Sequence, residues 1–477
     1  MHGEIPVRHA AVDLNRGESA QVALSDGSKV SVKLLDLQET LDDVNASVRR
    51  AEVTVEVNGQ VTKLTSATYH LPVTFAGVQI DCPITAGYRA KARKGMPGQA
   101  APNVWGLEKD ARLRFWPLGS PWIEPDTFTY PARQRWFASF TQMANEPVYV
   151  DGGEVPGKKE IYYHYGLDIG GCEGLIDIVA ATDGLVVSSG KEMLPEHKNT
   201  PVSPRYDVVY LQDGRGWYYR YSHLKFMEAR IRPGARVRKG EKLGVLGKEG
   251  GSGGWSHLHF DISRRQPSGH WGIEEGYAFL WEAYLAEHAP KLLAVGRPHH
   301  TIWGGQKVTL DASRSWGKGL RFEWTFTDGT SAAGEKVERA YEKPGSYCET
   351  LKVTDAEGRV DYDFPVVQVY DKARPEKLPP SIHANYAPTF GIRPGDPVTF
   401  KVRTFRTQEG EETWDFGDGT PPVKAKSDGN AVQHAAAGYA ELIHRFEKPG
   451  IYLVKVDRAN AEGVRATARL CVRVGGE

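Results

Sequence analysis

The sequence predicts a multidomain, mainly β protein, and three observations lead to that prediction. The chain of 477 residues exceeds the length that one hydrophobic core usually supports. Short stretches of alternating apolar and polar residues recur along it, and turns rich in Gly, Asp and Asn separate them. Two segments of the last third resemble each other, which indicates a repeated domain.

The N-terminal region, residues 1–125, is predicted to be a β-rich domain followed by a connection. Up to about residue 71, Asp26-Gly27 and Asn58-Gly59 interrupt runs of alternating apolar residues. Such interruptions are hairpin signals and favour a β-sandwich or barrel. The stretch from residue 90 to 130 is rich in Gly, Pro, Trp and Arg and has no clear period, so we expect a structured connection packed on the next domain.

Residues 126–291 are predicted to form an antiparallel β-sheet domain. Short β-type stretches recur there, among them LIDIVAAT, YDVVYLQ and HLHFDIS, with Gly- and Asp-containing turns between them. The segment GYAFLWEAYLAEHAPKLL has apolar residues at helical spacing. We expect it to close the domain as a single helix.

Residues 292–371 and 381–477 are predicted to be two similar β-sandwiches. FEWTFTDGT and YEKPGSY in the first copy correspond to WDFGDGT and FEKPGIY in the second, which aligns Trp324 with Trp414. Both tryptophans are expected in hydrophobic cores, and the Asp-Gly and Lys-Pro-Gly pairs in turns. The Pro- and Lys-rich stretch DKARPEKLPP between the copies is expected to be extended and semi-rigid.

The charge balance and hydropathy limit the classes of partner. Sixty Lys and Arg residues offset sixty Asp and Glu residues, so no overall field draws the chain to nucleic acid or to an anionic membrane. No apolar run reaches the roughly 18 residues of a membrane-spanning segment. The amino terminus lacks an apolar stretch of signal-peptide length, so either the protein stays inside the cell or a leader was removed from this chain.

The four cysteines give no disulfide framework. Cys82, Cys172, Cys348 and Cys471 are too widely spaced for a CxxC pair. We interpret them as buried or isolated thiols, with one long-range bridge as the alternative. The redox compartment therefore stays open.

Two short segments combine histidine and carboxylate as a catalytic metal site requires. Catalytic zinc takes three protein ligands of N and O type and keeps one position open for water. His164 and Asp168 lie in YHYGLDIGG, and His257 and His259 lie in SHLHFDIS. The second pair would point to one face of a strand, about 7 Å apart, so that one binds the metal directly and the other acts through water.

The first pair requires a turn. In a straight strand His164 and Asp168 would be about 13 Å apart, too far for ligands of one ion. Gly166 and the Gly-Gly pair that follows argue against a helix, which would also bring these positions together. We therefore predict a turn at Tyr165-Gly166 that folds His164 back onto the following strand.

Four sequence blocks resemble the catalytic domain of the lysostaphin-like (LytM-like) peptidases. They are HYGLD, ATDGLVVSSG, YSHL and SHLHFDIS, and the Gly-rich GKEGGSGGWS precedes the last of them. Their order is that of the family, which makes the match specific. The resemblance implies that Zn²⁺ is bound by His164, Asp168 and His259, and that the unliganded catalytic histidines are His223 and His257.

The implied site has a consistent chemistry. Two neutral imidazoles and one carboxylate leave the zinc a net positive charge, enough to keep bound water acidic. A neutral His223 or His257 accepts the water proton, and the protonated form stabilises the oxyanion; which residue does which stays open. Cys172 as an extra ligand is disfavoured, because a fourth protein ligand would close the catalytic position.

Two further features bear on the substrate groove. The segment KEMLPEHKNTPVSPRYD is longer than the usual turn of the family and is expected to wall the groove, while GKEGGSGGWS is expected to shape its rim. Tyr162 and Tyr163 precede the first ligand; core packing is the favoured reading and oxyanion stabilisation the alternative.

The family resemblance implies a zinc metalloendopeptidase that hydrolyses peptide bonds in bacterial cell-wall peptidoglycan, in stems or cross-bridges. The C-terminal copies resemble PKD (polycystic-kidney-disease-type) domains, immunoglobulin-like sandwiches of secreted bacterial hydrolases, although Thr325 and Thr327 depart from the usual motif. Both resemblances imply an extracellular, periplasmic or cell-envelope location, where these domains would contact substrate or other envelope components. The alternatives are a non-catalytic zinc-binding adhesion or envelope scaffold, and a secreted protease acting on Gly-rich proteins.

Overall fold

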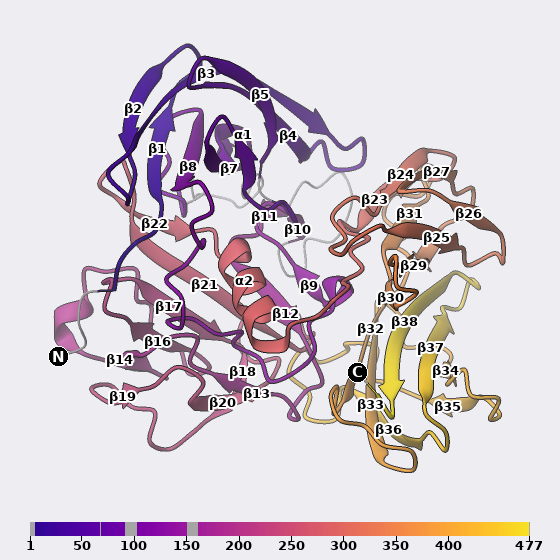
Figure 1. The fold of residues 1–477 in the computed structure, drawn as a ribbon. Coiled ribbons are helices and arrows are strands. Elements are labelled where there is room, and N and C mark those ends of the chain that lie inside the picture. Colours follow the sequence, from indigo (N-terminus) through magenta and orange to yellow (C-terminus); the bar gives the residue numbers. More distant parts are fainter. Residues whose placement is uncertain (1–4, 67, 91–102, 150–160, 477) are drawn as a thin grey trace.

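The computed structural model describes residues 5–66, 68–90, 103–149 and 161–476 (Figure 1). Nearly all its regular elements are β-strands, and most neighbouring strands are antiparallel. The prediction of a mainly β, multidomain chain is confirmed. No helix in these described ranges combines the length and the apolar character needed to cross a lipid bilayer.

The N-terminal region is a sandwich of two four-stranded sheets. One consists of β2 (Ser19–Ala23), β3 (Lys29–Leu41), β4 (Val48–Val57) and β5 (Gln60–Thr65). The other has the order β1 (Ala10–Leu14), β8 (Ala111–Pro117), β7 (Val78–Thr85), β6 (Val73–Phe75), and the short helix α1 (Ala86–Ala90) follows β7. Turns at Asp26-Gly27 and Asn58-Gly59 join neighbouring strands, as predicted.

The stretch from residue 90 to 130 was expected to be a connection, and in its described part this is wrong for β8. This strand lies inside the N-terminal sheet, between β1 and β7. All seven of its residues are buried. Its first five residues do alternate: Ala111, Leu113 and Phe115 pack in the sandwich core, while Arg112 and Arg114 on the other face are buried in ion pairs. An alternation this short gives only a weak signal in the sequence.

The central region is built on a nine-stranded antiparallel sheet. Its main path is β15 (Glu192–Met193), β14 (Gly184–Ser189), β16 (Val209–Gln212), β17 (Tyr218–Ser222), β21 (His257–Arg265), β12 (Leu167–Gly170) and β9 (Thr141–Gln142). Two more strands extend it, β19 (Arg236–Val237) beside β14 and β22 (Trp271–Glu274) beside β21. Smaller sheets contain β10 (Pro147–Tyr149) with β11 (Ile161–Tyr163), and β13 (Asp177–Val179), β20 (Lys242–Leu246) and β18 (Leu224–Met227).

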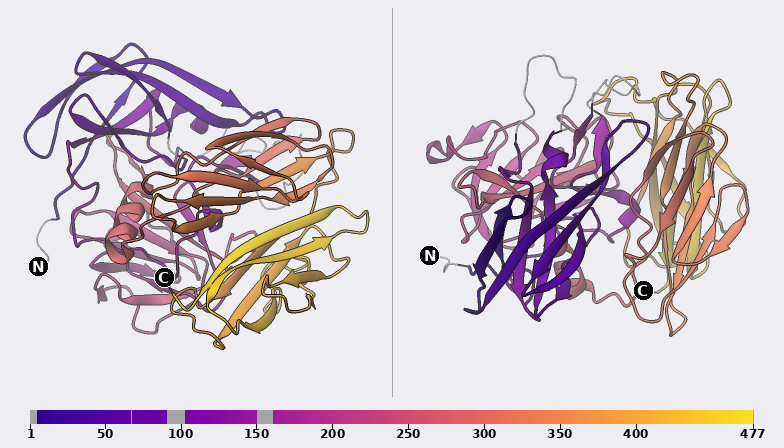
Figure 2. Two further views of the ribbon diagram at one scale, coloured as in Figure 1. Left: turned by 45° about the vertical axis from the view of Figure 1, so that its right-hand side comes forward. Right: turned by 90° about the horizontal axis from the view of Figure 1, so that it is seen from above.

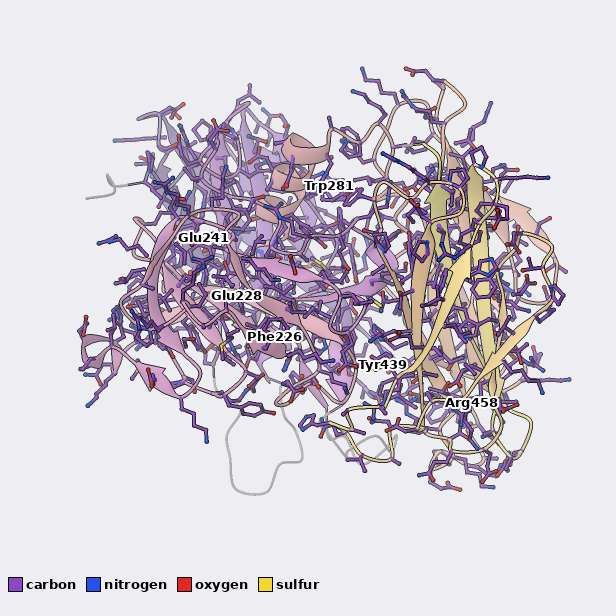
Figure 3. The ribbon with its side chains drawn as sticks, turned by 90° about the horizontal axis from the view of Figure 1, so that it is seen from below. Phe226, Glu228, Glu241, Trp281, Tyr439 and Arg458 are labelled. Carbon is purple, nitrogen blue, oxygen red and sulfur yellow. The ribbon has the colours of Figure 1, made fainter. Side chains whose placement is uncertain are left out.

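The predicted closing helix is α2 (Tyr277–His288), which packs its apolar residues into the core of the central region. Its Trp281 is buried against Trp136, with ring centroids 4.7 Å apart (Figure 3). Two 3-10 turns complete this part, η1 (Ala138–Phe140) and η2 (Pro195–His197).

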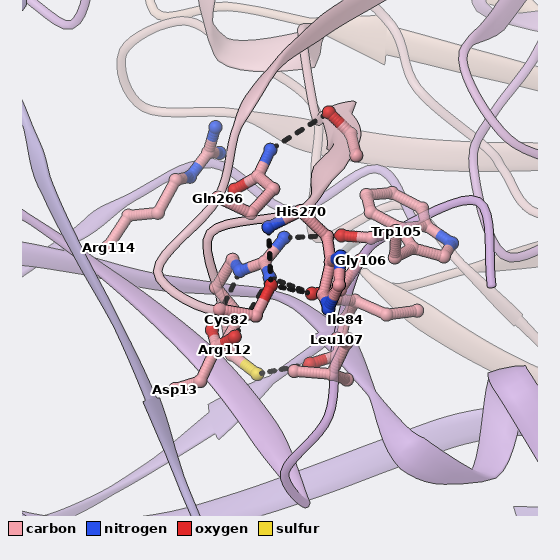
Figure 4. Close-up of polar contacts among 12 residues, drawn as sticks. Asp13, Cys82, Ile84, Trp105, Gly106, Leu107, Arg112, Arg114, Gln266 and His270 are labelled. Atoms are coloured by element: carbon pink, nitrogen blue, oxygen red, sulfur yellow. Dashed lines mark hydrogen bonds and ion pairs between the residues drawn. The ribbon is translucent and has the colours of Figure 1, made fainter. Parts of the chain in front are cut away.

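Buried Arg112 links the N-terminal sheet to the loop after β21 (Figure 4). Its guanidinium donates to Asp13 and to the Gly106 carbonyl. The Gly106 carbonyl also accepts a hydrogen bond from Ser268, which lies in that loop.

The two C-terminal copies lie side by side next to the central region (Figure 2). The first copy contains the sheets β24 (Lys307–Asp311) with β27 (Lys336–Ala340), and β26 (Ser331–Ala333), β25 (Arg321–Thr325), β29 (Thr350–Thr354) and β30 (Val360–Asp363). The second contains β32 (Ser381–Ala387), β33 (Pro397–Phe405) and β36 (Ala440–Arg445). As predicted, Trp324 and Trp414 are fully buried.

One seven-stranded sheet runs through both copies, in the order β23 (His300–Trp303), β31 (Val366–Tyr370), β28 (Gly345–Cys348), β38 (Arg465–Val474), β37 (Gly450–Ala459), β34 (Glu412–Asp415) and β35 (Val423–Ala425). The copies meet where Ser346 pairs with Ala466. The expectation of an extended linker is wrong over residues 371–377, because the amides of Arg374 and Lys377 close two consecutive turns there. The Asp371 side chain accepts from the Ala373 amide and stabilises the first of them.

Candidate active site

The three side chains predicted to bind a metal converge where β12 and β21 pair. Asp168 of β12 lies opposite His259 of β21, and His164 precedes β12. Asp168 Oδ1 is 3.1 Å from His164 Nε2 and 2.8 Å from His259 Nδ1, and the two nitrogens are 3.2 Å apart. All three residues are buried. One ion can therefore contact one atom from each.

The approach of His164 to Asp168 depends on a bend at Gly166. This residue has φ +74° and separates β11 from β12, so the predicted turn is confirmed. A Cβ at this position would lie 2.7 Å from both the Asp261 Cβ and the Phe260 carbonyl oxygen. Only glycine satisfies both the positive φ and the close approach to β21.

Contacts outside the triad orient both imidazoles. His164 Nδ1 lies 3.1 Å from the Met143 carbonyl, which can only accept, so Nδ1 carries the proton and Nε2 faces Asp168. His259 makes the reverse choice: its Nε2 is 3.2 Å from Asp261 Oδ2 and its Nδ1 faces the triad. Such outer hydrogen bonds are typical of metal-binding histidines. The donor set, two imidazole nitrogens and a carboxylate, fits a catalytic zinc.

The two remaining predicted histidines lie beside the triad. His257 is in the same strand as His259, and its Nε2 is 3.4 Å from Asp168 Oδ2. The rings of His223 and His257 have centroids 4.5 Å apart. His223 Nδ1 lies 2.6 Å from the Glu249 carbonyl, and His257 Nδ1 lies 3.1 Å from the Trp255 carbonyl. Both residues therefore carry the proton on Nδ1 and leave Nε2 as an acceptor.

Burial and charge give these groups different protonation behaviour. Burial lowers the pKa of His223 and lowers that of His257 further. Burial also acts to lower the pKa of His259, but hydrogen bonds to Asp168 and Asp261 outweigh it and raise that pKa. Burial opposes ionisation of Asp168, yet the neighbouring histidines hold its pKa well below the ordinary value. The pair beside the triad is therefore kept neutral, as a general base requires.

Models of known protein families match the central region and both C-terminal copies. The model of peptidase family M23 matches residues 162–269, which hold all five of these residues. This chain contains an M23 peptidase domain. Models of the PKD domain match residues 288–369 and 383–474, the two C-terminal copies. The resemblances read from the sequence are thus confirmed, and a metallopeptidase of the LytM type is the function class of the M23 domain.

Likenesses to solved structures are weak. The fibronectin(III)-like modules of Clostridium thermocellum CbhA are 10% identical over 38% of this chain and 92% of that chain, with TM-score 0.16. Bacteroides ovatus SGBP-B is 16% identical over 39% of this chain and 47% of that chain, with TM-score 0.16. Helicobacter pylori Csd3 is 14% identical over 55% of this chain and 83% of that chain, with TM-score 0.22.

The M23 site opens into a cavity of about 420 Å³ that other parts of the chain help to enclose. Its M23 side includes the five site residues and the Gly-rich segment at Gly251 and Gly253, so this segment forms the rim, as expected. The remaining wall comes from the N-terminal region, from residues 139–148 and from both PKD domains. It includes Arg49, Arg297, His299, His383, Arg406 and Arg469. A substrate in this cavity touches more than the M23 domain.

The long segment before β16, residues 191–207, does not wall the cavity as expected, since none of its residues lines it. Its last residue instead supports His223. Asp207 accepts a 3.0 Å hydrogen bond from the His223 amide and is held in turn by Arg205 at 2.7 Å. His223 has φ +69°, an unusual conformation for a non-glycine residue, and Asp207 stabilises it.

Several supporting residues were missed in the sequence. Asp261 lies inside the SHLHFDIS block, two residues after His259, so strand alternation places it on the same face. That spacing was a usable signal. Glu249 and Trp255 bind the two other histidines through main-chain carbonyls, and a main-chain contact leaves no signal in the sequence.

The structure disfavours Cys172 as a ligand and confirms core packing for Tyr163 but not for Tyr162. Cys172 is fully buried in the hydrophobic core, and burial raises the pKa of its thiol to about 12, which disfavours a metal-binding thiolate. The other three cysteines are also buried and free. Tyr163 is a core residue whose hydroxyl accepts from the Val48 amide at 2.7 Å, whereas Tyr162 lines the cavity.

Proposed function

We propose that the protein is a zinc-dependent metalloendopeptidase that hydrolyses peptide bonds of bacterial cell-wall peptidoglycan, in stem peptides or cross-bridges. One observation carries this proposal: the convergence of His164 Nε2, Asp168 Oδ1 and His259 Nδ1 within the reach of one ion. His223 and His257 lie beside them with free Nε2 atoms, inside a matched M23 domain.

In this proposal His164, Asp168 and His259 hold Zn²⁺. Zinc, when bound, supplies a Lewis acid that makes water acidic and polarises a peptide carbonyl. His259 is kept in the required tautomer by Asp261, and His164 by the Met143 carbonyl. The ionised Asp168 contributes the one negative charge among the ligands.

His223 and His257 provide the proton transfers. Their Nε2 atoms accept a proton from the attacking water and return it to the amine that leaves when the peptide C–N bond breaks. The imidazolium formed in between donates a hydrogen bond to the negatively charged oxygen of the tetrahedral intermediate. Because burial lowers both pKa values, the imidazoles are neutral and ready to accept at neutral pH.

The surroundings of the site favour an extended peptide as substrate. The cavity lies between the M23 domain and the other three parts of the chain, and a folded protein does not enter such a space. Stem and cross-bridge peptides of the cell wall are short and flexible, so we propose them as the substrate class. We therefore also propose that the protein works in the cell envelope or outside the cell. The proposed domains are residues 1–125, 126–291, 292–371 and 381–477.

The deciding experiment digests purified peptidoglycan and a Gly-rich protein in parallel, with and without a chelator. Chelator-sensitive release of muropeptides, with the cleaved bond identified by mass spectrometry, is the expected result. Cleavage of the Gly-rich protein alone would assign a general secreted protease. A zinc-loaded protein that binds peptidoglycan but cleaves neither substrate would assign an envelope scaffold.

A further inference from the structure

The Gly-rich segment of the M23 domain, residues 250–256, is held from outside by the second PKD domain. In Figure 3, Tyr439 lies where that PKD domain meets the M23 domain. Side chains of the PKD domain bond four successive sites on the segment's main chain. Three main-chain carbonyls accept from this domain: Gly250 from His434 Nε2 at 2.7 Å, Gly253 from Asn430 Nδ2 at 3.2 Å, and Gly254 from Arg403 Nη1 at 2.6 Å. The Ser256 amide donates to the Tyr439 hydroxyl at 2.7 Å.

The PKD side of this contact is rigid. Arg403 has no exposed surface, and Asp428 binds its guanidinium through two hydrogen bonds of 2.8 and 2.6 Å. The carbonyls of Val432 and Gln433 accept from it as well, both at 2.8 Å. Arg403 therefore presents Nη1 to the M23 domain from a fixed position.

The M23 side is shaped to receive this contact. Gly254 has φ +85°, and a Cβ there would lie 2.1 Å from Asn430 Oδ1 and 3.0 Å from Arg403 Nη1. A residue with a side chain would collide with the PKD domain at this point. A segment this rich in glycine has little conformational preference of its own, so its position depends on such contacts.

The held segment and Glu249, the residue directly before it, carry the supports of both unliganded histidines. His223 Nδ1 binds the Glu249 carbonyl, directly before the Gly250 contact. His257 Nδ1 binds the Trp255 carbonyl, between the contacts at Gly254 and Ser256. The Trp255 ring also stacks on the His257 ring, with centroids 3.7 Å apart and an interplanar angle of 16°.

We propose that the second PKD domain is a working part of the peptidase site, in which Arg403 and Tyr439 are positioning residues for His223 and His257. The inference rests on the proposed peptidase function and extends it to a domain outside the matched M23 region. The metal ligands do not depend on this contact, because β12, β21, Met143 and Asp261 hold them. Loss of the contact should therefore lower turnover and leave metal binding intact.

The test uses the full chain with Tyr439→Phe, which removes one hydroxyl, and the double variant Asn430→Ala/His434→Ala, which removes two contacts of less buried side chains. Tyr452→Phe is the matched control, since the Tyr452 hydroxyl donates to the Lys448 carbonyl within the same PKD domain. Small displacements of a catalytic group cost up to about 100-fold in rate, so we expect kcat to fall about tenfold in both test variants. KM, zinc content and the control should stay at wild-type values.

Hydrogen–deuterium exchange of residues 248–256 provides a readout that needs no activity. Faster exchange there in the test variants, with no change around His164, is the expected result. Unchanged exchange together with unchanged kcat would overturn the proposal, and so would a parallel loss of zinc, which would show general disruption. A zinc-loaded wild-type protein that cleaves no substrate would contradict the proposed function, whereas the exchange experiment decides the positioning role separately.

Discussion

The three proposed metal ligands and the two other site histidines lie within a few ångström of each other, yet the chain holds the two groups in different ways. His164, Asp168 and His259 are oriented by the central sheet and by contacts inside its own region, Met143 and Asp261. His223 and His257 depend on the Gly-rich segment, which the second PKD domain holds. From this difference we infer that metal binding and turnover should be separable in the proposed site.

Removing a ligand is the strongest way to test that separation. Asp168→Ala takes away the negative charge that balances the ion and leaves its neighbours His164 and His259 without their shared partner. We expect complete loss of bound zinc and of peptidase activity, measured by elemental analysis and muropeptide release. Chelated wild-type protein should regain activity with added zinc, and the variant should not. A variant that keeps its zinc would contradict the ligand assignment.

Removing an unliganded histidine should affect turnover alone. Loss of a general acid or base lowers a rate by about 10² to 10⁴, so His223→Ala and His257→Ala are each expected to show a decrease of that size. Zinc content should equal that of wild type, because neither imidazole is among the three grouped ligands. Loss of zinc from either variant would assign that histidine to the metal instead.

Weakening an outer contact should reduce metal affinity without abolishing it. Asp261→Asn replaces the carboxylate that accepts from His259 Nε2, and such changes typically weaken metal binding about 10- to 100-fold. Titration with a competing chelator measures the shift. Activity at saturating zinc should return close to wild type. If it stays low, Asp261 acts on catalysis rather than through the ligand.

The pH profile distinguishes the two unliganded histidines. A base acts in its neutral form, so activity should persist below pH 6.5 and be lost only as the pH falls through the lowered pKa values. Asp207 raises the pKa of His223 by hydrogen bonding. Asp207→Asn should therefore move the acid limb of kcat to lower pH if His223 is the base. The control is Asp177→Asn, which removes a partly exposed carboxylate that pairs with Lys242. An acid limb that does not move in Asp207→Asn would assign the base to His257.

The smallest effect is expected at Cys172. Its thiol lies in the core and its pKa is raised to about 12, so Cys172→Ala should leave zinc content and kcat unchanged. Elemental analysis of both proteins checks this. A lower zinc content in a variant that is otherwise folded would return the thiol to the ligand set.

Much of the fold was predictable because its signals are local. Asp-Gly and Asn-Gly pairs between alternating runs predicted the hairpins, and the repeat around Trp324 and Trp414 predicted the C-terminal sandwiches. The exceptions have physical causes. β8 alternates over only five residues, and the polar ones are arginines buried in ion pairs. The linker after Asp371 turns because side chains stabilise turns that composition does not reveal.

The sequence by itself determined the chemistry of the site: the five residue types, the pairing of His257 with His259 on one strand face, and the bend that Gly166 permits. Tertiary structure alone decided what surrounds and steadies them. The Ser256 amide meets the Tyr439 hydroxyl across 183 positions of sequence, and the Glu249 and Trp255 carbonyls orient two imidazoles. Local spacing follows from backbone geometry, whereas contacts made by packed domains and by main-chain atoms leave no pattern in the order of side chains.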